Sequence, residues 1–355
     1  YFYDAIISMA PPITQESRIV IVDIDERSLA SEGTWPWPRA TIAKLIRELT
    51  DSQHVAMLGL DIVFPESRAG DALLQAALDQ PQVVMSQILD FQPGSNNHIG
   101  KLTGGVAVSG SGRAQAVQGY IANHAGLLPA RELVGHISPL IDVDGQVRRL
   151  YPLACHGQTC SVALSLRMYL QLMANDSASL QAVLASAPPA LHLQATPDNP
   201  LDLPLDSQGA WLVPYRVAPG GFAVLSAADV LHAGRSLPEL ENTLVLVGSS
   251  ALGIGDKVST PLSAIAPGVE VHAQLLSALL DQHFIRPLPA KSPLFLVLAA
   301  VVVLSWLVWP RRGRYAMPAW LLTLLVTLSV LLPWLLLDEG LWLPLPVLPL
   351  MVISI

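Results

Sequence analysis

Charged residues are scarce in this sequence, and basic residues are scarcer than acidic ones. Only 14% of the 355 residues are charged, compared with roughly 25% in an average soluble protein, and 52% are hydrophobic. The net charge of -8 and the pI near 5.5 argue against the basic surface that nucleic acids require. We therefore exclude a nucleic acid partner and expect part of the chain to contact the lipid bilayer.

Cysteine is nearly absent. Cys155 and Cys160 stand in CHGQTC with one histidine between them, too few ligands for a four-coordinate zinc site. A disulfide across a tight turn fits this spacing and requires an oxidising compartment. A pair of free thiols in a hairpin is the alternative.

Charge is missing altogether from three long runs at the end of the chain, at about 292–310, 315–337 and 340–355. The first two have the length that a bilayer core requires, and the third begins another such run. We therefore predict three transmembrane helices within 291–355.

The charges between these runs predict their orientation. Arg311, Arg312 and Arg314 separate the first two runs, and the positive-inside rule places them in the cytoplasm. Residues 13–290 are then an extracytoplasmic domain, and residues 1–12 are the end of a preceding membrane or juxtamembrane helix. An output module is expected after residue 355.

The stretch 19–39, IVIVDIDERSLASEGTWPWPR, predicts how the outer domain folds. Its first four residues are apolar without alternation, as in a strand that is covered on both faces. Helical and strand patterns then alternate along the chain, which predicts an α/β fold with a mixed, largely parallel sheet flanked by helices. Further strands are expected at 54–64, 82–89, 146–154, 211–216 and 243–247, and helices at 39–49, 70–80, 161–173, 226–232 and 267–281.

Three carboxylates follow predicted strands. Asp23 and Asp25 end the first strand, and Asp61 lies late in the second. Because parallel strands place their carboxyl ends at one sheet edge, these side chains could converge there on a hard cation or a cationic ligand. The alternative is that they cap turns and helices.

Two further groups are candidate ligand-binding residues. Trp35, Trp37 and Arg39 belong to a Trp-Pro-Trp-Pro-Arg sequence that either seals the sheet edge or lines a pocket. Ser249 and Asp256 lie in a small-residue loop after an apolar strand; such a loop either holds an anion through backbone N–H groups or packs closely. It lacks Gly-Lys-Ser/Thr, which excludes a Walker phosphate site. We predict no cofactor and no metal site.

Two stretches carry little apolar patterning. Residues 91–114 are rich in Gly, Ser and Asn and predict a mobile loop or lid. Residues 174–200 are rich in Ala, Ser and Pro and predict a surface excursion without function.

The ordered combination of four segments resembles the type-two CHASE sensor domain. The segments are IVIVDIDERSLASEGTWPWPR at 19–39, LGLDIVFPE at 58–66, DGQVRRLYPL at 144–153, and the stretch from LVLVGSSALGIGDKVSTPL to PGVEVHAQLLSALL at 244–280. The resemblance implies an N-terminal span, an outer sensing domain, three further spans and a cytoplasmic output domain such as a nucleotide cyclase, diguanylate cyclase or kinase. It carries over no catalytic residue.

The leading hypothesis is therefore a bacterial receptor. It would cross the inner membrane several times, act as a homodimer, and respond to a small molecule or an envelope protein. One alternative is an extracytoplasmic metal-dependent membrane hydrolase built on the three aspartates, although no nucleophile elbow or Ser/His/Asp arrangement accompanies them. Another alternative is a structural subunit of an envelope complex.

Overall fold

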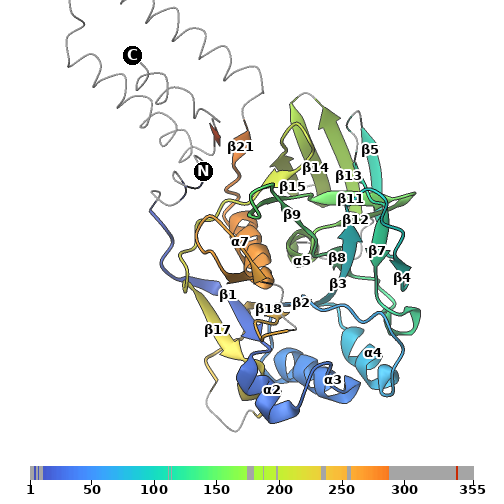
Figure 1. Cartoon of the computed structure of the whole chain (residues 1–355), viewed down its shortest axis with the longest axis vertical. Helices are drawn as coiled ribbons and strands as arrows, with labels where there is room; N and C mark the ends of the chain where they lie inside the picture. The colour runs from blue at the N-terminus through green and yellow to red at the C-terminus, as the bar shows by residue number, and fades with distance from the viewer. Residues whose placement is uncertain are drawn as a thin grey trace, which may run out of the picture.

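An eight-stranded mixed sheet forms the centre of the molecule (Figure 1). The computed structural model describes residues 4, 7, 11–110, 112, 114–173, 180–186, 188–196, 199–232, 237–253, 257–287 and 341–342. The strand order is β17-β1-β18-β2-β3-β7-β4, with β8 beside β3; neighbours are parallel except β3 and β7. The bounds are β17 Phe222–Ser226, β1 Glu16–Asp23, β18 Leu244–Gly248, β2 Met57–Leu60, β3 Val83–Asp90, β7 Gly119–Ile121, β4 His98–Ile99 and β8 Val134–His136. The predicted mixed, largely parallel α/β sheet is confirmed.

Strand β1 lies inside this sheet, between β17 and β18. Its apolar side chains alternate between two separate cores. Ile19 and Ile21 belong to one core, and Val20 and Val22 to the other. Burial on both faces explains why this run shows no polar alternation.

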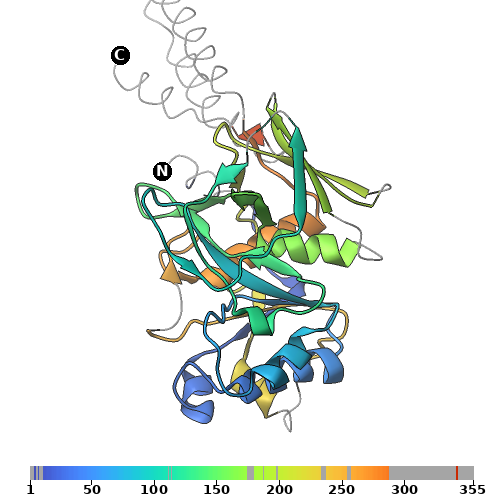
Figure 2. The ribbon, with the colours of Figure 1, turned by 90° about the vertical axis from the view of Figure 1, so that its right-hand side faces the viewer.

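Helices cover both faces of the sheet (Figure 2). The core of Val20 and Val22 contains side chains of α3, α4 and α6, and the core of Ile19 and Ile21 contains side chains of α5 and α7. The helices are α2 Glu26–Glu32, α3 Arg39–Arg47 continued by the π-helix η1 Glu48–Ser52, α4 Asp71–Leu78, the 3-10 helix η2 Ala125–Leu127, α5 Leu164–Met173, α6 Ala227–Leu231 and α7 Gly268–Leu280.

Smaller sheets complete the domain. Three of them have three or four strands: β15-β14-β13-β5, β16-β10-β9 and β12-β11-β6. Their bounds are β15 Asn199–Pro204, β14 Pro189–Thr196, β13 Leu180–Ser186, β5 Val106–Gly110, β16 Trp211–Leu212, β10 Val147–Leu150, β9 Pro139–Ile141, β12 Thr159–Val162, β11 Leu153–His156 and β6 Gln115–Ala116. The single strand predicted at 146–154 is thus two strands, β10 and β11, in different sheets.

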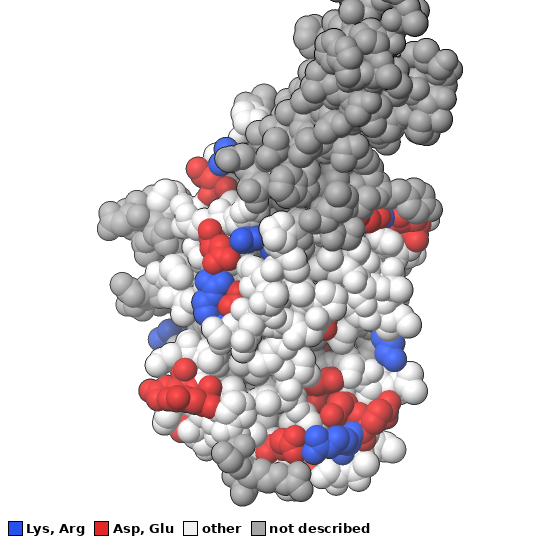
Figure 3. Space-filling view, turned by 90° about the vertical axis from the view of Figure 1, so that its left-hand side faces the viewer, with Lys and Arg blue, Asp and Glu red and all other residues white. Residues whose placement is uncertain are grey.

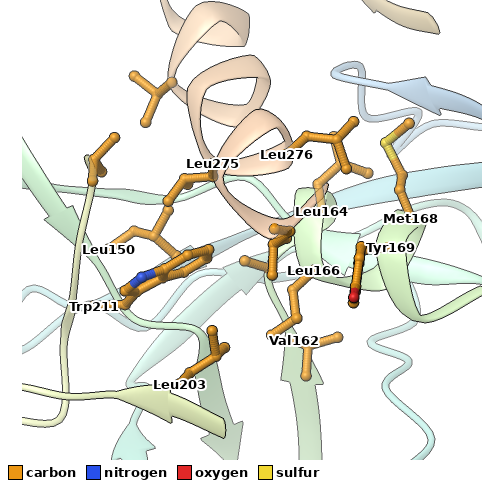
Figure 4. Close-up of a cluster of buried hydrophobic side chains, with 14 of the residues drawn as sticks. Leu150, Val162, Leu164, Leu166, Met168, Tyr169, Leu203, Trp211, Leu275 and Leu276 are labelled. Atoms are coloured by element: carbon orange, nitrogen blue, oxygen red, sulfur yellow. The ribbon is translucent and has the colours of Figure 1, made fainter. Parts of the chain in front are cut away.

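The core between these sheets and the helices is continuous (Figure 4). Leu275 of α7 lies beside Leu150 and Trp211, while Leu276 lies on the side of Leu164 and Met168 of α5 (Figure 4). Trp211 is fully buried. The small sheets are therefore joined to the central sheet through α5 and α7.

The surface excursion predicted at 174–200 is wrong for the described residues. They form most of the antiparallel strands β13, β14 and β15. Leu191 and Leu193 alternate into the core. The prediction failed because the Ala, Ser and Pro content of the stretch obscured this two-residue period.

The mobile loop or lid predicted at 91–114 is wrong for residues 98–99 and 106–110, which form strands. The stretch contains β4 and β5, and β5 pairs in parallel with β13. A Cβ atom at Gly104 would collide with the carbonyl oxygen of Cys160, and one at Gly110 with that of Leu184. The glycines allow close approach of backbones instead of mobility.

Most of the predicted transmembrane runs lie outside the described residues. Within the described part of the chain, no helix is both long and apolar enough to cross a bilayer. Two short strand pairs remain: β19 Lys257–Val258 with β20 Ala266–Pro267, and β21 Arg286–Pro287 with β22 Leu341–Trp342. The second pair places the end of the outer domain beside the start of the third uncharged run.

Candidate functional site

Asp25 caps the helix that follows it. Its Oδ1 accepts from the backbone N–H of Ser28 at 2.8 Å, from the Ser28 hydroxyl at 2.7 Å and from the Ser226 hydroxyl at 2.8 Å. These bonds lower the pKa of Asp25 against the opposing effect of burial, which is the largest single influence. Ser28 Oγ in turn accepts from Ala228 N–H at 3.0 Å. The cluster therefore caps both α2 and α6.

Asp23 is held by the loop after β18. Both its carboxylate oxygens accept from Ser250, one from the backbone N–H at 2.7 Å and one from the hydroxyl. Burial raises the pKa of Asp23, and the negative charge of Asp25 adds to the effect. Ser249 Oγ donates to the carbonyl of Ile24 at 2.9 Å.

The small-residue loop thus binds carboxylates of its own chain. Ser250 N–H donates to Asp23, and Leu252 N–H donates to Glu26 Oε1 at 2.8 Å. These two backbone donors, which could have held an external anion in one of the two interpretations of the loop, are engaged in this way. Asp256, the other residue predicted in this loop, lies outside the described residues.

Asp61 does not join the other two carboxylates. Strand β18 separates β1 from β2, so Asp23 pairs with Gly248 on one side while Asp61 follows Leu60 on the other. Two strand spacings amount to about 10 Å. In the described part of the chain, no group of three or more His, Cys, Asp or Glu is arranged to hold a metal ion.

The predicted Trp-Pro-Trp-Pro-Arg residues lie where α3 begins, at Arg39. Trp37 is 1% exposed and donates its Nε1–H to the Gly33 carbonyl at 2.9 Å. Arg39 is 4% exposed, pairs with Asp71 at 3.0 Å and lies over the ring of Phe64. Trp35 contacts Trp37 with ring centroids 5.7 Å apart, and its bond to Pro36 is cis. Trp37 belongs to the core that also contains side chains of α3, α4 and α6, and Trp35 packs against that core.

A cavity of about 610 Å³ lies at the same carboxyl edge, on the side of β3 and α7. Of the predicted site residues that the structure describes, only Asp61 lines it. The other lining residues come from the end of β3 and the following loop, β7, β9 with the residues before it, β10, β19 and the start of α7: Ile88–Pro93, Asn97, Tyr120, Ile121, Ile137–Ile141, Leu150, Lys257, Val258, Gly268, Val271 and His272. Sequence patterns gave no signal for it because its walls are distant in sequence.

Two buried histidines lie at this cavity. His272 lines it, and His136 lies close enough to His272 for the two rings to interact electrostatically. Burial lowers the pKa of His136 to about 3 and that of His272 to about 4. Both rings are therefore neutral at physiological pH.

The disulfide hairpin contacts a wall of the cavity. Cys155 and Cys160 form a disulfide and pair directly across β11 and β12. The ring of His156 lies 5.1 Å from that of Tyr120, a cavity residue. The hairpin is thereby joined to the cavity wall.

The surface carries no extended basic area in the described part of the face shown in Figure 3. Acidic and basic side chains lie beside one another in small groups there. Elsewhere in the described part of the chain, ion pairs bring opposite charges together, as Arg27 with Asp229 at 2.9 Å.

Comparison with known proteins gives one family. The CHASE2 domain model matches residues 1–309. No curated protein and no solved structure matches the chain. The match covers well over half of the chain and confirms the resemblance seen in its motifs. The chain belongs to the CHASE2 domain family, whose members are extracellular sensory domains of signalling receptors.

Proposed function

We propose that the chain is the sensory and transmembrane part of a bacterial signal-transduction receptor in the inner membrane. The outer domain, residues 13–290, responds to an envelope signal and passes it to a cytoplasmic nucleotide cyclase, diguanylate cyclase or kinase. Membership of the CHASE2 family over residues 1–309 is the observation that carries this proposal.

Two features support the membrane arrangement. The uncharged runs at 292–310, 315–337 and 340–355 have about the length of bilayer spans, and three arginines follow the first run. The pairing of β21 with β22 puts Arg286 beside Leu341. Both residues are extracytoplasmic in a topology of three spans.

Reporter fusions test this topology. Alkaline phosphatase, which is active only outside the cytoplasm, is fused after Gln282 or after Arg312 in the full chain. We expect activity from the first fusion and none from the second. The reverse pattern would overturn the proposed orientation.

The receptor function is tested on the complete gene product in membranes. Cyclase and kinase activities are assayed with the outer domain intact and with Trp37→Ala, which removes a buried core side chain, against the exposed control Leu73→Ala. We expect output to change only in the Trp37 variant. A stoichiometric partner in every growth condition, without any output activity, would favour a structural subunit.

We further propose that the receptor acts as a homodimer in which the outer domains bias the packing of the membrane helices. Chemical cross-linking in intact membranes tests the stoichiometry. We expect a band at twice the monomer mass, and a monomer under all conditions would contradict the proposal.

A further inference from the structure

We propose that His98 and His156 together bind a divalent transition-metal ion, such as Zn²⁺ or Cu²⁺. This inference rests on the proposed sensory function, because it names a chemical class of signal for the outer domain. We call these two residues the His98–His156 pair.

The His98–His156 pair is assembled from two different sheets. His98 lies in β4 at the edge of the central sheet, and His156 lies in β11 of the disulfide hairpin. Their ring centroids are 4.9 Å apart, and the ring of Tyr120 in β7 lies 5.1 Å from each of them. Sequence patterns gave no signal for this pair because the two strands are far apart in the chain.

The spacing of the two rings suits a shared metal ion. A tetrahedral ion that holds two imidazole nitrogens at about 2.1 Å puts the ring centres roughly 5 Å apart. The observed separation of 4.9 Å agrees with this value. The angle of 67° between the ring planes is compatible with it, because a metal–nitrogen bond does not fix the tilt of one ligand ring against another.

A hydrogen bond leaves one nitrogen of His98 available. The Nε2 atom lies 3.1 Å from the carbonyl oxygen of Gln118. A carbonyl can only accept, so the neutral ring donates its Nε2–H there and keeps its lone pair on Nδ1. Residue 98 is exposed. Histidines that bind metals commonly donate their second N–H to a backbone carbonyl in this way, which orients the ring.

His156 is held in place without the use of its ring nitrogens. It precedes the turn at Gly157 and Gln158, and the disulfide between Cys155 and Cys160 closes the neighbouring cross-strand pair. Neither ring nitrogen has a hydrogen-bonding partner among the described residues, and neither is buried. The hairpin therefore positions an imidazole that is free to bind a ligand.

The ligands of the pair determine the class of ion. Imidazole suits Zn²⁺, Cu²⁺ and Ni²⁺, whereas Mg²⁺ and Ca²⁺ require oxygen ligands. Among the described residues, no third His, Cys, Asp or Glu completes a set of metal ligands. Structural zinc sites use four protein ligands, so two ligands favour a reversible site.

The position of the pair explains how such an ion would be sensed. An ion bound to both histidines joins the edge of the central sheet to the disulfide hairpin. It thereby favours one arrangement of these two parts of the domain over another, as a sensor requires.

Two metal probes test the proposal on the untagged 355-residue chain in lipid nanodiscs. Electron paramagnetic resonance identifies the nitrogen ligands of bound Cu²⁺, and calorimetric titration measures the affinity for Zn²⁺. We expect the tightest Cu²⁺ site to have two imidazole ligands in the wild type. His98→Gln and His156→Gln should each weaken binding of Zn²⁺ at least about tenfold.

A third histidine provides the matched control. His192 of β14 is also exposed, and its ring contacts Asp202 at 2.6 Å. We expect His192→Gln to bind both ions as the wild type does. Thermal unfolding without metal should be the same for all three variants, because none of them removes a core side chain. Added Zn²⁺ should raise the melting temperature of the wild type and of His192→Gln only.

Three results would overturn the proposal: no saturable binding of either ion at submillimolar concentration, binding of wild-type strength in both His98→Gln and His156→Gln, or an equal loss in His192→Gln. The topology and output assays of the proposed receptor need no added metal. Failure of the metal inference is therefore distinguishable from failure of the receptor function.

Discussion

At the scale of single residues, the aspartates at the carboxyl edge of the sheet stand where a ligand would bind, but they form hydrogen bonds within the protein. Asp25 stands where a ligand-binding aspartate would be expected, yet it caps α2 and binds Ser226. Asp23 is bound by Ser250. Glu270, in the first turn of α7, is half-buried and close enough to Asp23 for the two carboxyls to repel each other.

The Glu270 carboxyl should therefore make stability depend on pH. Burial, followed by the charge of Asp23, raises its pKa. Folding thus favours the protonated form, and this contribution is fully present below the unfolded pKa and is lost as pH rises through the folded pKa. We expect Glu270→Gln to raise the free energy of unfolding at pH 7.5 and to leave it nearly unchanged at pH 3.5, as measured by urea unfolding. The exposed Glu239→Gln serves as control, and a loss of stability at pH 7.5 would contradict the argument.

At the scale of elements, the glycine-rich stretch 91–114 is built into the small sheets. Gly104 lies against the backbone of Cys160, and β5 joins the sheet of β13. A mobile segment would tolerate a methyl group at Gly104, whereas a packed one would not.

Gly104→Ala should accordingly destabilise the domain by about 3 kcal/mol, at the upper end of the usual cost of overpacking. At Gly94 a Cβ meets no atom within 4 Å, and only the positive φ of 86° opposes it. Gly94→Ala should therefore cost about 1 kcal/mol. The melting temperatures of the two variants are compared by thermal unfolding. Equal values would support the interpretation of 91–114 as a mobile loop.

Another element-scale feature is the attachment of the N-terminal residues to β10. Arg148 is buried and pairs with Asp4 at 2.7 Å, with Asp142 at 2.8 Å and with Asp144 at 2.7 Å. The hydrogen bond from Arg148 is the main cause of the lowered pKa of Asp4. Leu150, two residues along the same strand, lines the cavity of about 610 Å³. Strand β10 therefore joins the cavity to the segment that leads toward the predicted first span.

Asp4→Asn should loosen this attachment. The variant removes a charge-assisted bidentate pair at low exposure, so a loss of about 1–2 kcal/mol is expected. Hydrogen exchange of residues 1–12 should accelerate about tenfold for each 1.4 kcal/mol lost locally. The control is Asp229→Asn, whose partner Arg27 is 60% exposed, where little change is expected. Equal hydrogen exchange of residues 1–12 in both variants would show that Arg148 of β10 does not hold the N-terminal segment.

At the scale of the whole molecule, the sequence pattern predicted features that depend on the burial of neighbouring residues in the chain, such as a buried strand. The uninterrupted run Ile19–Val22 predicted an interior strand, since both its faces contact helices. Pattern could not predict that Asp23 and Asp61 lie on opposite sides of β18, because strand order depends on how the whole chain folds. The cavity was missed for the same reason, as Phe91, Leu140 and His272 meet only in three dimensions.

The last prediction concerns the two buried histidines. It belongs to the scale of the whole domain because His136 lies in β8 and His272 in α7, and the two interact electrostatically. His136 is fully buried and His272 is 4% exposed, and burial lowers the pKa of each, to about 3 and about 4. A lowered histidine pKa stabilises the folded state above the unfolded value near 6.5, and this contribution is lost as pH falls toward the folded value. Each ring should then lower the free energy of unfolding by about 1.4 kcal/mol for each pH unit of acidification between about pH 6 and pH 4.

The double variant His136→Phe with His272→Phe should remove most of this slope, because neither position can then take up a proton on unfolding. Urea unfolding at half-unit steps from pH 7 to pH 4 measures it, and the exposed His192→Gln should keep the wild-type slope. The raised carboxyl pKa values of Asp23 and Glu270 act in the opposite direction, whereas carboxyls with a lowered pKa, such as Glu16, lose their stabilising contribution below about pH 5. Between pH 7 and about pH 5 the variant should therefore become more stable while the wild type weakens. An unchanged slope in the double variant would show that the neutral histidines do not govern acid stability, and that the loss has to be sought in the lowered carboxyl pKa values of the ion pairs, led by Glu16 at about 2.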